Sequence, residues 1–90
     1  MSQTYYKRYV DTDVRVTKEG KIVPTALYWF NYKPVPDRYV IDRIEGEPVR
    51  EHSRVGGTGL CYKIIIRGEM RKLFLEEGDV FRFFMESKKP

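Results

Sequence analysis

The sequence predicts an all-β protein in which a single antiparallel meander of five to six strands curls into a small barrel or half-barrel. Glycine and proline interrupt the 90-residue chain at short intervals, and no long apolar stripe with a helical period is present. Instead, short stretches of alternating apolar and polar residues recur at a spacing of roughly 8–12 residues, which is typical of antiparallel β domains. A flat sheet of this size would leave one face and two edges exposed, so we expect it to curl.

The first expected strand covers residues 10–16 and the second covers residues 22–30. In the first, valine or threonine at every even position alternates with charged residues, which indicates a half-buried strand. Gly20 can supply a positive φ in the turn between the two strands. Pro24 cannot donate to a β-ladder, so we expect an edge or a bulge in the second strand. The loop that follows, residues 31–37, contains two prolines that stiffen it.

Four further strands are expected over residues 38–44, 60–66, 70–76 and 80–86. Turns that contain glycine separate them. Residues 49–54 either continue the third strand after a bend or form a short turn. We expect one domain over residues 1–90, with frayed ends at residues 1–4 and 87–90.

Composition limits the classes of function. The chain has 17 Lys and Arg against 13 Asp and Glu, a net charge of +4 and a pI near 9.3. Both signs are mixed along the sequence, so this balance favours weak attraction to polyanions without predicting nucleic-acid binding. No apolar run approaches the roughly 18–20 residues of a membrane span, and the N-terminal residues lack the apolar stretch of a signal peptide. We therefore expect a cytoplasmic protein with no membrane partner.

The sequence offers little material for catalysis or metal binding. Cys61 is the only cysteine, which excludes an internal disulfide, and with the only histidine, His52, it falls short of the four ligands of a typical zinc site. A nucleophile pair of Cys61 and His52 would lack a third, orienting group. A lone cysteine at the start of an apolar strand is more often a small buried side chain. We therefore predict no enzyme, no catalytic residue, no metal and no cofactor.

Three glycines fall within V-G-G-T-G-L, residues 55–60. Gly57 and Gly59 match the first two positions of the dinucleotide-binding pattern G-x-G-x-x-G, but Tyr62 occupies the third, and a strand rather than a helix follows. Because no helical N–H groups would face a phosphate, a bend or a β-bulge is the simpler interpretation. A loop that contacts a ligand is the alternative.

The aromatic segment at residues 28–32 is the strongest sign of a binding surface. Neighbouring side chains on a strand face opposite ways, so its tyrosines, Trp29 and Phe30 cannot all be buried. Basic residues lie close by in the sequence, and single-strand nucleic-acid binders combine aromatic and basic side chains in this way. The interpretations are a second buried cluster under the loop, a protein or self-association surface, and a nucleic-acid surface.

Asp42 is the most conspicuous carboxylate. It is expected on an apolar strand, on the same face as Val40 and Ile44, and should therefore need a partner. A salt bridge across the sheet is the simpler explanation, and a carboxylate that grips a ligand in the barrel mouth is the alternative. The candidate binding residues are Trp29, Tyr32, Lys33, Arg38, Asp42, Arg43, Lys63 and Arg67.

Several motifs occur in a fixed order along residues 10–84: V-x-V, G-K-I-x-P, Y-V-I-D-R-I, G-G-x-G-x-x-Y, I-x-G, L-F and G-D-x-F. This order resembles a group of short, uncharacterised bacterial proteins, a domain of unknown function. The residues that carry the resemblance are Gly20, Ile22, Pro24, Trp29, Tyr39, Ile41, Asp42, Arg43, Gly56, Gly57, Gly59, Tyr62, Gly68, Leu73 and Phe74. The resemblance implies a bacterial protein with one β-rich domain, and it transfers no catalytic residue.

The functional hypothesis from the sequence is a non-catalytic small β-barrel that presents an aromatic and basic surface, built around residues 28–43, to a protein partner or to another copy of itself. The alternative is a small barrel that binds nucleic acid, with basic residues on the phosphates and exposed Tyr or Trp on the bases. The aromatic content and the expected sheet edges favour self-association as one form of the first hypothesis.

Overall fold

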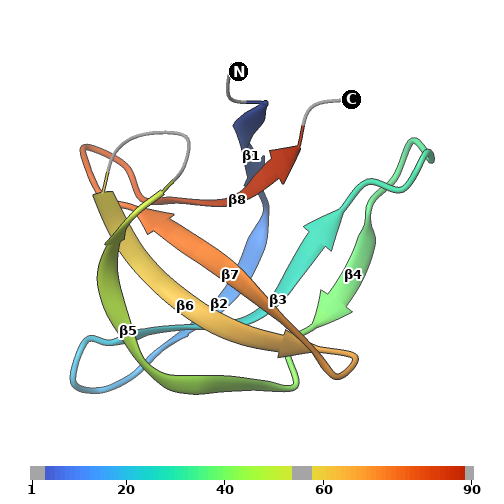
Figure 1. Ribbon diagram of the computed structural model, residues 1–90. Coiled ribbons are helices and arrows are strands. Elements are labelled where there is room, and N and C mark those ends of the chain that lie inside the picture. The colour runs from blue at the N-terminus through green and yellow to red at the C-terminus, as the bar shows by residue number, and fades with distance from the viewer. Residues whose placement is uncertain (1–3, 54–57, 89–90) are drawn as a thin grey trace.

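The computed structural model describes residues 4–53 and 58–88, and all of their regular structure is antiparallel β-sheet (Figure 1). The strands are β1 (Tyr5–Val10), β2 (Thr12–Val16), β3 (Ile22–Trp29), β4 (Asp37–Val40), β5 (Arg43–His52), β6 (Thr58–Ile66), β7 (Glu69–Glu76) and β8 (Arg82–Lys88). One sheet has the order β1-β8-β7-β6-β5 and the other has the order β2-β3-β4. The all-β prediction is therefore confirmed. No helix long and apolar enough to cross a membrane occurs in these residues.

The strands form two sheets rather than one meander, because two of the predicted strands are divided. The expected strand over residues 10–16 is interrupted at Asp11, and β1 begins already at Tyr5. The expected strand over residues 38–44 is interrupted at Ile41 and Asp42. In both places the chain leaves one sheet and enters the other almost without a loop (Figure 1). Alternation of apolar residues continues across the interruption at Asp11 and so gives no sign of it. At Ile41–Asp42 the alternation shifts by one residue, because Tyr39, Ile41 and Ile44 all face the main core.

Other details of the strands agree with the sequence. The turn before β3 contains Gly20 with φ of 86°. The ladder between β2 and β3 shifts register opposite Thr25, next to Pro24, as expected for a bulge. Residues 49–52 continue β5 after a register shift. Of the glycine stretch, Gly56 and Gly57 lie outside the described residues, whereas Gly59 is part of β6.

The main core lies between the two sheets. Its buried members are Leu27, Ile41, Tyr62, Ile64, Leu73 and Leu75. The large sheet contributes alternate residues of β6 and β7, as the period of two requires. The Tyr62 hydroxyl donates to the carbonyl of Ile22 at 2.8 Å, which ties β6 to β3, and burial raises the pKa of this phenol.

A second, smaller cluster lies on the other face of the large sheet. It consists of Cys61, Phe74 and Phe84, and the two phenyl rings stack with centroids 5.2 Å apart. This cluster explains why Leu73, Phe74 and Leu75 are all buried although neighbours on a strand face opposite ways. Burial raises the pKa of the Cys61 thiol, so this cysteine behaves as a small apolar side chain.

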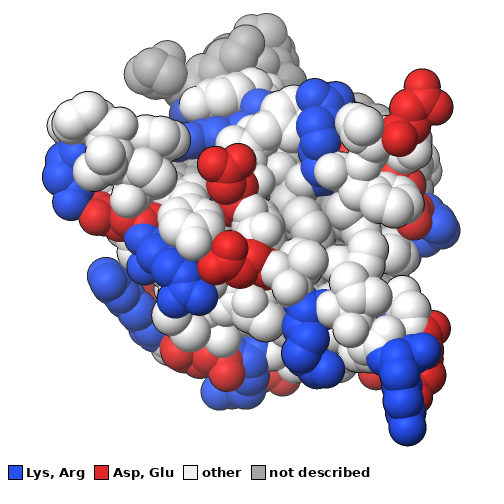
Figure 2. All heavy atoms as spheres, turned by 180° about the vertical axis from the view of Figure 1, so that it is seen from behind, with Lys and Arg blue, Asp and Glu red and all other residues white. Residues whose placement is uncertain are grey.

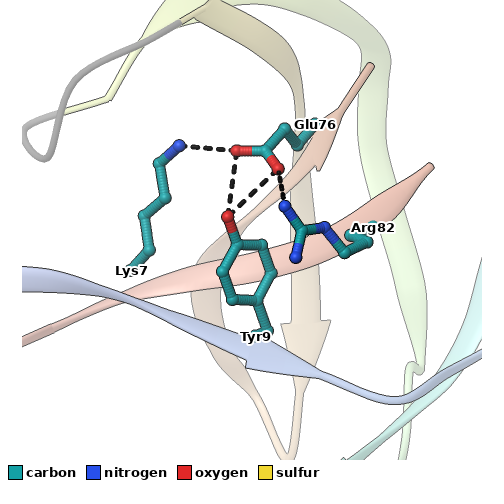
Figure 3. Close-up of polar contacts among 4 residues, drawn as sticks. All are labelled: Lys7, Tyr9, Glu76 and Arg82. Atoms are coloured by element: carbon teal, nitrogen blue, oxygen red, sulfur yellow. Dashed lines mark hydrogen bonds and ion pairs between the residues drawn. The ribbon is translucent and has the colours of Figure 1, made fainter. Parts of the chain in front are cut away.

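Glu76 organises the charged residues that cover this second cluster (Figure 3). Its carboxylate accepts hydrogen bonds from the Lys7 ammonium, from the Tyr9 hydroxyl at 3.0 Å and from the Arg82 guanidinium at 2.9 Å. The Lys7 ammonium also lies 5.1 Å from the centroid of Phe84, and the Tyr9 ring packs edge-on against the same ring. Three strands are thereby joined over one aromatic side chain.

We expect Glu76 to make stability depend on pH. The hydrogen bond from Lys7, with those from Tyr9 and Arg82, holds the pKa of the Glu76 carboxyl below its usual value of 4.5. A carboxyl whose pKa is lower in the folded state stabilises that state above the unfolded pKa and loses this contribution as the pH falls through the folded pKa. Urea unfolding between about pH 6 and pH 3 should therefore show a smaller loss of stability for Glu76→Gln than for the native protein.

Tyr9→Phe is the graded control for this prediction. It removes one hydrogen bond but keeps Lys7, the largest cause of the lowered pKa of Glu76, so its pH profile should lie between the other two. If stability fell with pH equally in Glu76→Gln and in the native protein, Glu76 would not be a source of the pH dependence.

Candidate functional site

An open groove of about 500 Å³ lies at one end of the space between the two sheets, and we call it the Trp29 groove. Five strands, β3, β4, β6, β7 and β8, and two connections contribute to it, so residues far apart in the sequence meet there. It is lined by Leu27, Trp29, Asn31, Tyr39, Ile66, Arg67, Glu69, Arg71, Met85, Glu86, Ser87 and Lys88. Leu27 belongs to the main core, so the floor of the groove is apolar and continuous with the folded interior.

Trp29 and Tyr39 are the aromatic walls of the groove. Trp29 ends β3, and Tyr39 lies on β4 opposite Leu27, so both side chains point to the core face of the small sheet. Both are half-buried and pack against the main core. The Arg8 guanidinium stacks 3.6 Å from the centre of the Trp29 ring and donates to the carbonyl of Phe30 at 3.1 Å.

Arg67 reaches the groove from the β6–β7 hairpin. The two-residue turn between Ile66 and Glu69 has φ of 51° at Arg67 and 80° at Gly68, as a type I′ turn requires. The Asp42 carboxylate accepts the Arg67 N–H at 3.0 Å and so holds the turn in place. The Arg67 guanidinium then lies 4.9 Å from the centroid of Tyr39.

A polar network fixes the hairpin between β3 and β4 beside the groove. Asn31 donates to the Tyr39 hydroxyl at 2.7 Å and to Asp37 at 3.0 Å, and Lys33 pairs with Asp37 at 2.7 Å. The hydrogen bonds from Lys33 and then Asn31 lower the pKa of Asp37, and the same contact raises the pKa of Lys33. The charges of Lys33 and Asp37 are therefore paired with each other.

The free charges at the groove are positive. Arg71 is paired with Glu69 at 2.7 Å. Arg8, Arg67 and Lys88, in contrast, form no ion pair with any carboxylate among residues 4–53 and 58–88. Arg67 and Lys88 line the groove, and Arg8 stacks on the Trp29 ring that forms one of its walls, so an anionic ligand in the groove would meet positive charge beside two aromatic rings.

The structure divides the predicted binding residues among several surfaces. Trp29 and Arg67 line the groove, and Asp42 acts on it through the Arg67 N–H. Tyr32 is fully exposed at the hairpin tip, at φ of 61°, next to Lys33. The predicted surface around residues 28–43 is therefore not continuous.

The remaining three predicted residues lie on other faces. Arg38 is on the outer face of the small sheet, where it binds Asp13 at 3.1 Å and where Tyr28 donates to the same carboxylate oxygen. Arg43 and Lys63 are on the outer face of the large sheet, and Arg43 pairs with Glu45 at 2.8 Å. On the face seen in Figure 2, Lys and Arg are likewise interspersed with Asp and Glu rather than gathered in one basic patch.

Asp42 corrects one expectation from the sequence. It was expected on an apolar strand, but it lies in the connection between β4 and β5 and is exposed. Its partner is a backbone N–H rather than a cation across the sheet. The carboxylate is therefore not a buried charge, and its role in the fold is to support the Arg67 turn.

Sequence reasoning missed Arg8, Asn31, Arg71 and Lys88. They come from β1, the β3–β4 hairpin, β7 and β8, which meet only because β1 pairs with β8 and β7 lies beside it. No local pattern connects them. The sequence contained one sign of β1, the segment Y-Y-K-R-Y-V, whose aromatic residues are typical of a strand.

Cys61 and His52 do not come together. Cys61 is paired in register with Val49, and His52 lies three residues further along β5, so the two side chains face opposite sides of the large sheet. Cys61 is buried, whereas His52 is exposed.

Comparison with known proteins adds no assignment: no family model, no curated protein and no solved structure matches this chain.

Proposed function

We propose that the protein is a non-catalytic small β-barrel binding module and that the Trp29 groove holds an acidic segment of a protein partner. The observation that carries the proposal is a set of three cations with no carboxylate partner among the described residues. Arg67 and Lys88 line the groove beside two half-buried aromatic rings, and Arg8 stacks on one of these rings, that of Trp29. An apolar floor with a few convergent polar groups is typical of a binding site. Carboxylates are the natural partners of guanidinium groups because they accept two N–H bonds at once.

We also propose that the two sheets form one half-open barrel. The chain runs from β1 into β2 and from β4 into β5 almost without a loop, so each of these long bent strands belongs first to one sheet and then to the other. Counted in this way, the strands follow one another in chain order around a common core, which supports the barrel. The groove would then be one of its open mouths.

A protein partner is favoured over nucleic acid by the positions of the two guanidinium groups. Arg8 covers one face of Trp29, and Arg67 lies against Tyr39, so these rings offer less surface on which bases could stack. Single-stranded nucleic acid is the second candidate, and one observation favours it: Tyr32 is fully exposed beside Lys33 and has both ring faces available.

The proposal is tested by titrating the protein with a labelled peptide of alternating glutamate and leucine and, in parallel, with labelled oligo(dT). We expect the peptide to bind with a dissociation constant below about 100 µM at low salt, and to bind more tightly than oligo(dT) under the same conditions. Arg67→Asn should weaken peptide binding about tenfold, because a hydrogen-bonded charge pair is lost. The Asn-Gly sequence that results is the preferred type I′ turn, so the hairpin is retained.

Arg43→Asn is the matched control, because Arg43 is an exposed arginine on another face and should leave peptide affinity unchanged. Absence of peptide binding would refute the groove proposal. Oligo(dT) binding that is tighter than peptide binding, with log K falling by about 0.7 per phosphate contact as log salt rises, would support the second candidate instead.

A further inference from the structure

A free sheet edge runs along β2. This strand ends the three-stranded sheet, and within the described part of the chain its backbone bonds to β3 alone. The Asp11 carbonyl accepts the Tyr28 N–H, and the Asp13 carbonyl accepts the Thr25 hydroxyl. The N–H of Thr17 donates to the carbonyl of Lys21, the residue just before β3. The odd-numbered residues therefore direct their backbone groups toward β3.

The even-numbered residues of β2 direct their backbone groups to the open edge. Consecutive residues in an antiparallel ladder alternate between the two sides, so the N–H and C=O groups of Thr12, Val14 and Val16 have no strand beside them. Opposite Val14 stands Pro24, which has no N–H to give, in agreement with this alternation. The edge offers three donors and three acceptors in a regular row.

On the core-facing side of this edge, two valine side chains are exposed. Val14 is 43% exposed and Val16 is 63% exposed, and both border an open cavity of about 460 Å³. Phe81, 62% exposed, lies across that cavity. Charges or proline on the edge commonly protect exposed edges in monomeric proteins. The charges of β2, Asp13 and Arg15, lie on its outer face, whereas the exposed valines of its other face favour a partner strand.

We propose that β2 pairs antiparallel with β2 of a second copy, about a two-fold axis at Val14. In this register Val14 faces the partner's Val14, and Thr12 faces the partner's Val16. All three even-numbered residues then form hydrogen-bonded pairs, so every free N–H and C=O of the edge is satisfied. The apolar side chains of both copies lie side by side on the core-facing side.

Charge complementarity selects a second copy as the partner. Pairing about Val14 places Asp13 opposite the partner's Arg15, and Arg15 opposite the partner's Asp13, on the outer face. Arg15 forms no ion pair with the residues that the structure describes. The bonds from Tyr28 and Arg38 to Asp13 both use Oδ2, which leaves Oδ1 for the partner's Arg15. A self-complementary pattern of this kind fits an isologous dimer.

This inference goes beyond the proposed function and does not depend on it. It uses β2 and the cavity at Phe81, whereas the Trp29 groove is built from other residues. The two proposals can therefore fail separately. A monomer that binds the acidic peptide would contradict the dimer alone, and a dimer that does not bind the peptide would contradict the groove proposal alone.

Sedimentation velocity on the full chain, from about 10 µM to about 1 mM, should show a monomer–dimer equilibrium. Arg15→Glu should shift this equilibrium to monomer, because glutamate would face the partner's Asp13. Lys63→Glu, the same change of charge at an exposed lysine in the large sheet, should leave the dimer intact.

Cross-linking tests the register. Cα atoms of a hydrogen-bonded antiparallel pair are about 5.5 Å apart, within the range of a disulfide, so Val14→Cys should cross-link on oxidation. In Val16→Cys the two new cysteines would lie four positions apart along the strands, about 13 Å, and should not cross-link. The native Cys61 is buried and does not compete. A monomer throughout the concentration range, or cross-linking of Val16→Cys as fast as that of Val14→Cys, would overturn the proposal.

Discussion

Replacing Gly59 by alanine is expected to lower the free energy of unfolding by about 2–3 kcal/mol. A Cβ atom at this position would lie 2.6 Å from the carbonyl oxygen of Leu75 and 3.3 Å from its carbonyl carbon. These atoms are backbone of β7, in the centre of the large sheet, so they cannot rotate away as a side chain would. Either β6 and β7 move apart or the ladder between them is disturbed. Urea unfolding would show the loss as a lower transition midpoint.

Gly78→Ala is the matched control for this substitution. A Cβ atom on Gly78 would meet nothing within 4 Å, so the free energy of unfolding should stay within about 0.5 kcal/mol of the native value. Equal losses in the two variants would show that the approach of β7 to Gly59 is not the cause.

Replacing Phe74 by alanine is expected to destabilise the protein by about 3–5 kcal/mol. Phe74 is buried, stacks on Phe84 and belongs to the second cluster, which has only three buried members. The remaining two side chains and the charged residues around Glu76 could not fill the space. A domain of this length has a total stability of about 5–13 kcal/mol, so the variant should be close to unfolding at 37 °C. Calorimetry would measure the shift in Tm.

Phe30→Ala serves as the control, because it removes the same side chain from a site that is 51% exposed. The free energy of unfolding of this variant should stay within about 0.5 kcal/mol of the native value. If Phe74→Ala proved equally mild, the second cluster would contribute little to stability, and the covering charges would be the more important part of that face.

The period of two was sufficient to predict the all-β class and most strand positions, because a half-buried strand must alternate regardless of its neighbours. The division at Asp11 and at Ile41–Asp42 could not be predicted in this way. At Asp11 the side-chain alternation is unchanged, and only the neighbouring strand differs. At Ile41–Asp42 the alternation shifts by one residue, but such a shift does not tell which strand the next segment pairs with. Sheet membership is decided by contacts between residues far apart in the sequence.

The candidate site was predictable only in part, for the same reason. Trp29 was identified because an aromatic run on a strand must expose some of its members, and Arg67 only as one of several basic residues that could contact phosphates. Arg8 and Lys88 reach the groove through the pairing of β1 with β8. Nothing in the sequence distinguished Arg67 from the other basic candidates, Arg38, Arg43 and Lys63. These three lie away from the groove because their side chains are on the outer faces of the two sheets.

The pairing of β1 with β8 also affects how the chain can fold. Tyr5 is in register with Lys88, so β1 and β8 lie side by side (Figure 1). The hairpins from β5 to β8 can form from local contacts, but β1 must wait for the last strand and then close a loop that spans nearly the whole chain. We therefore expect Arg8 to reach the Trp29 ring, one wall of the groove, only after β1 has paired with β8.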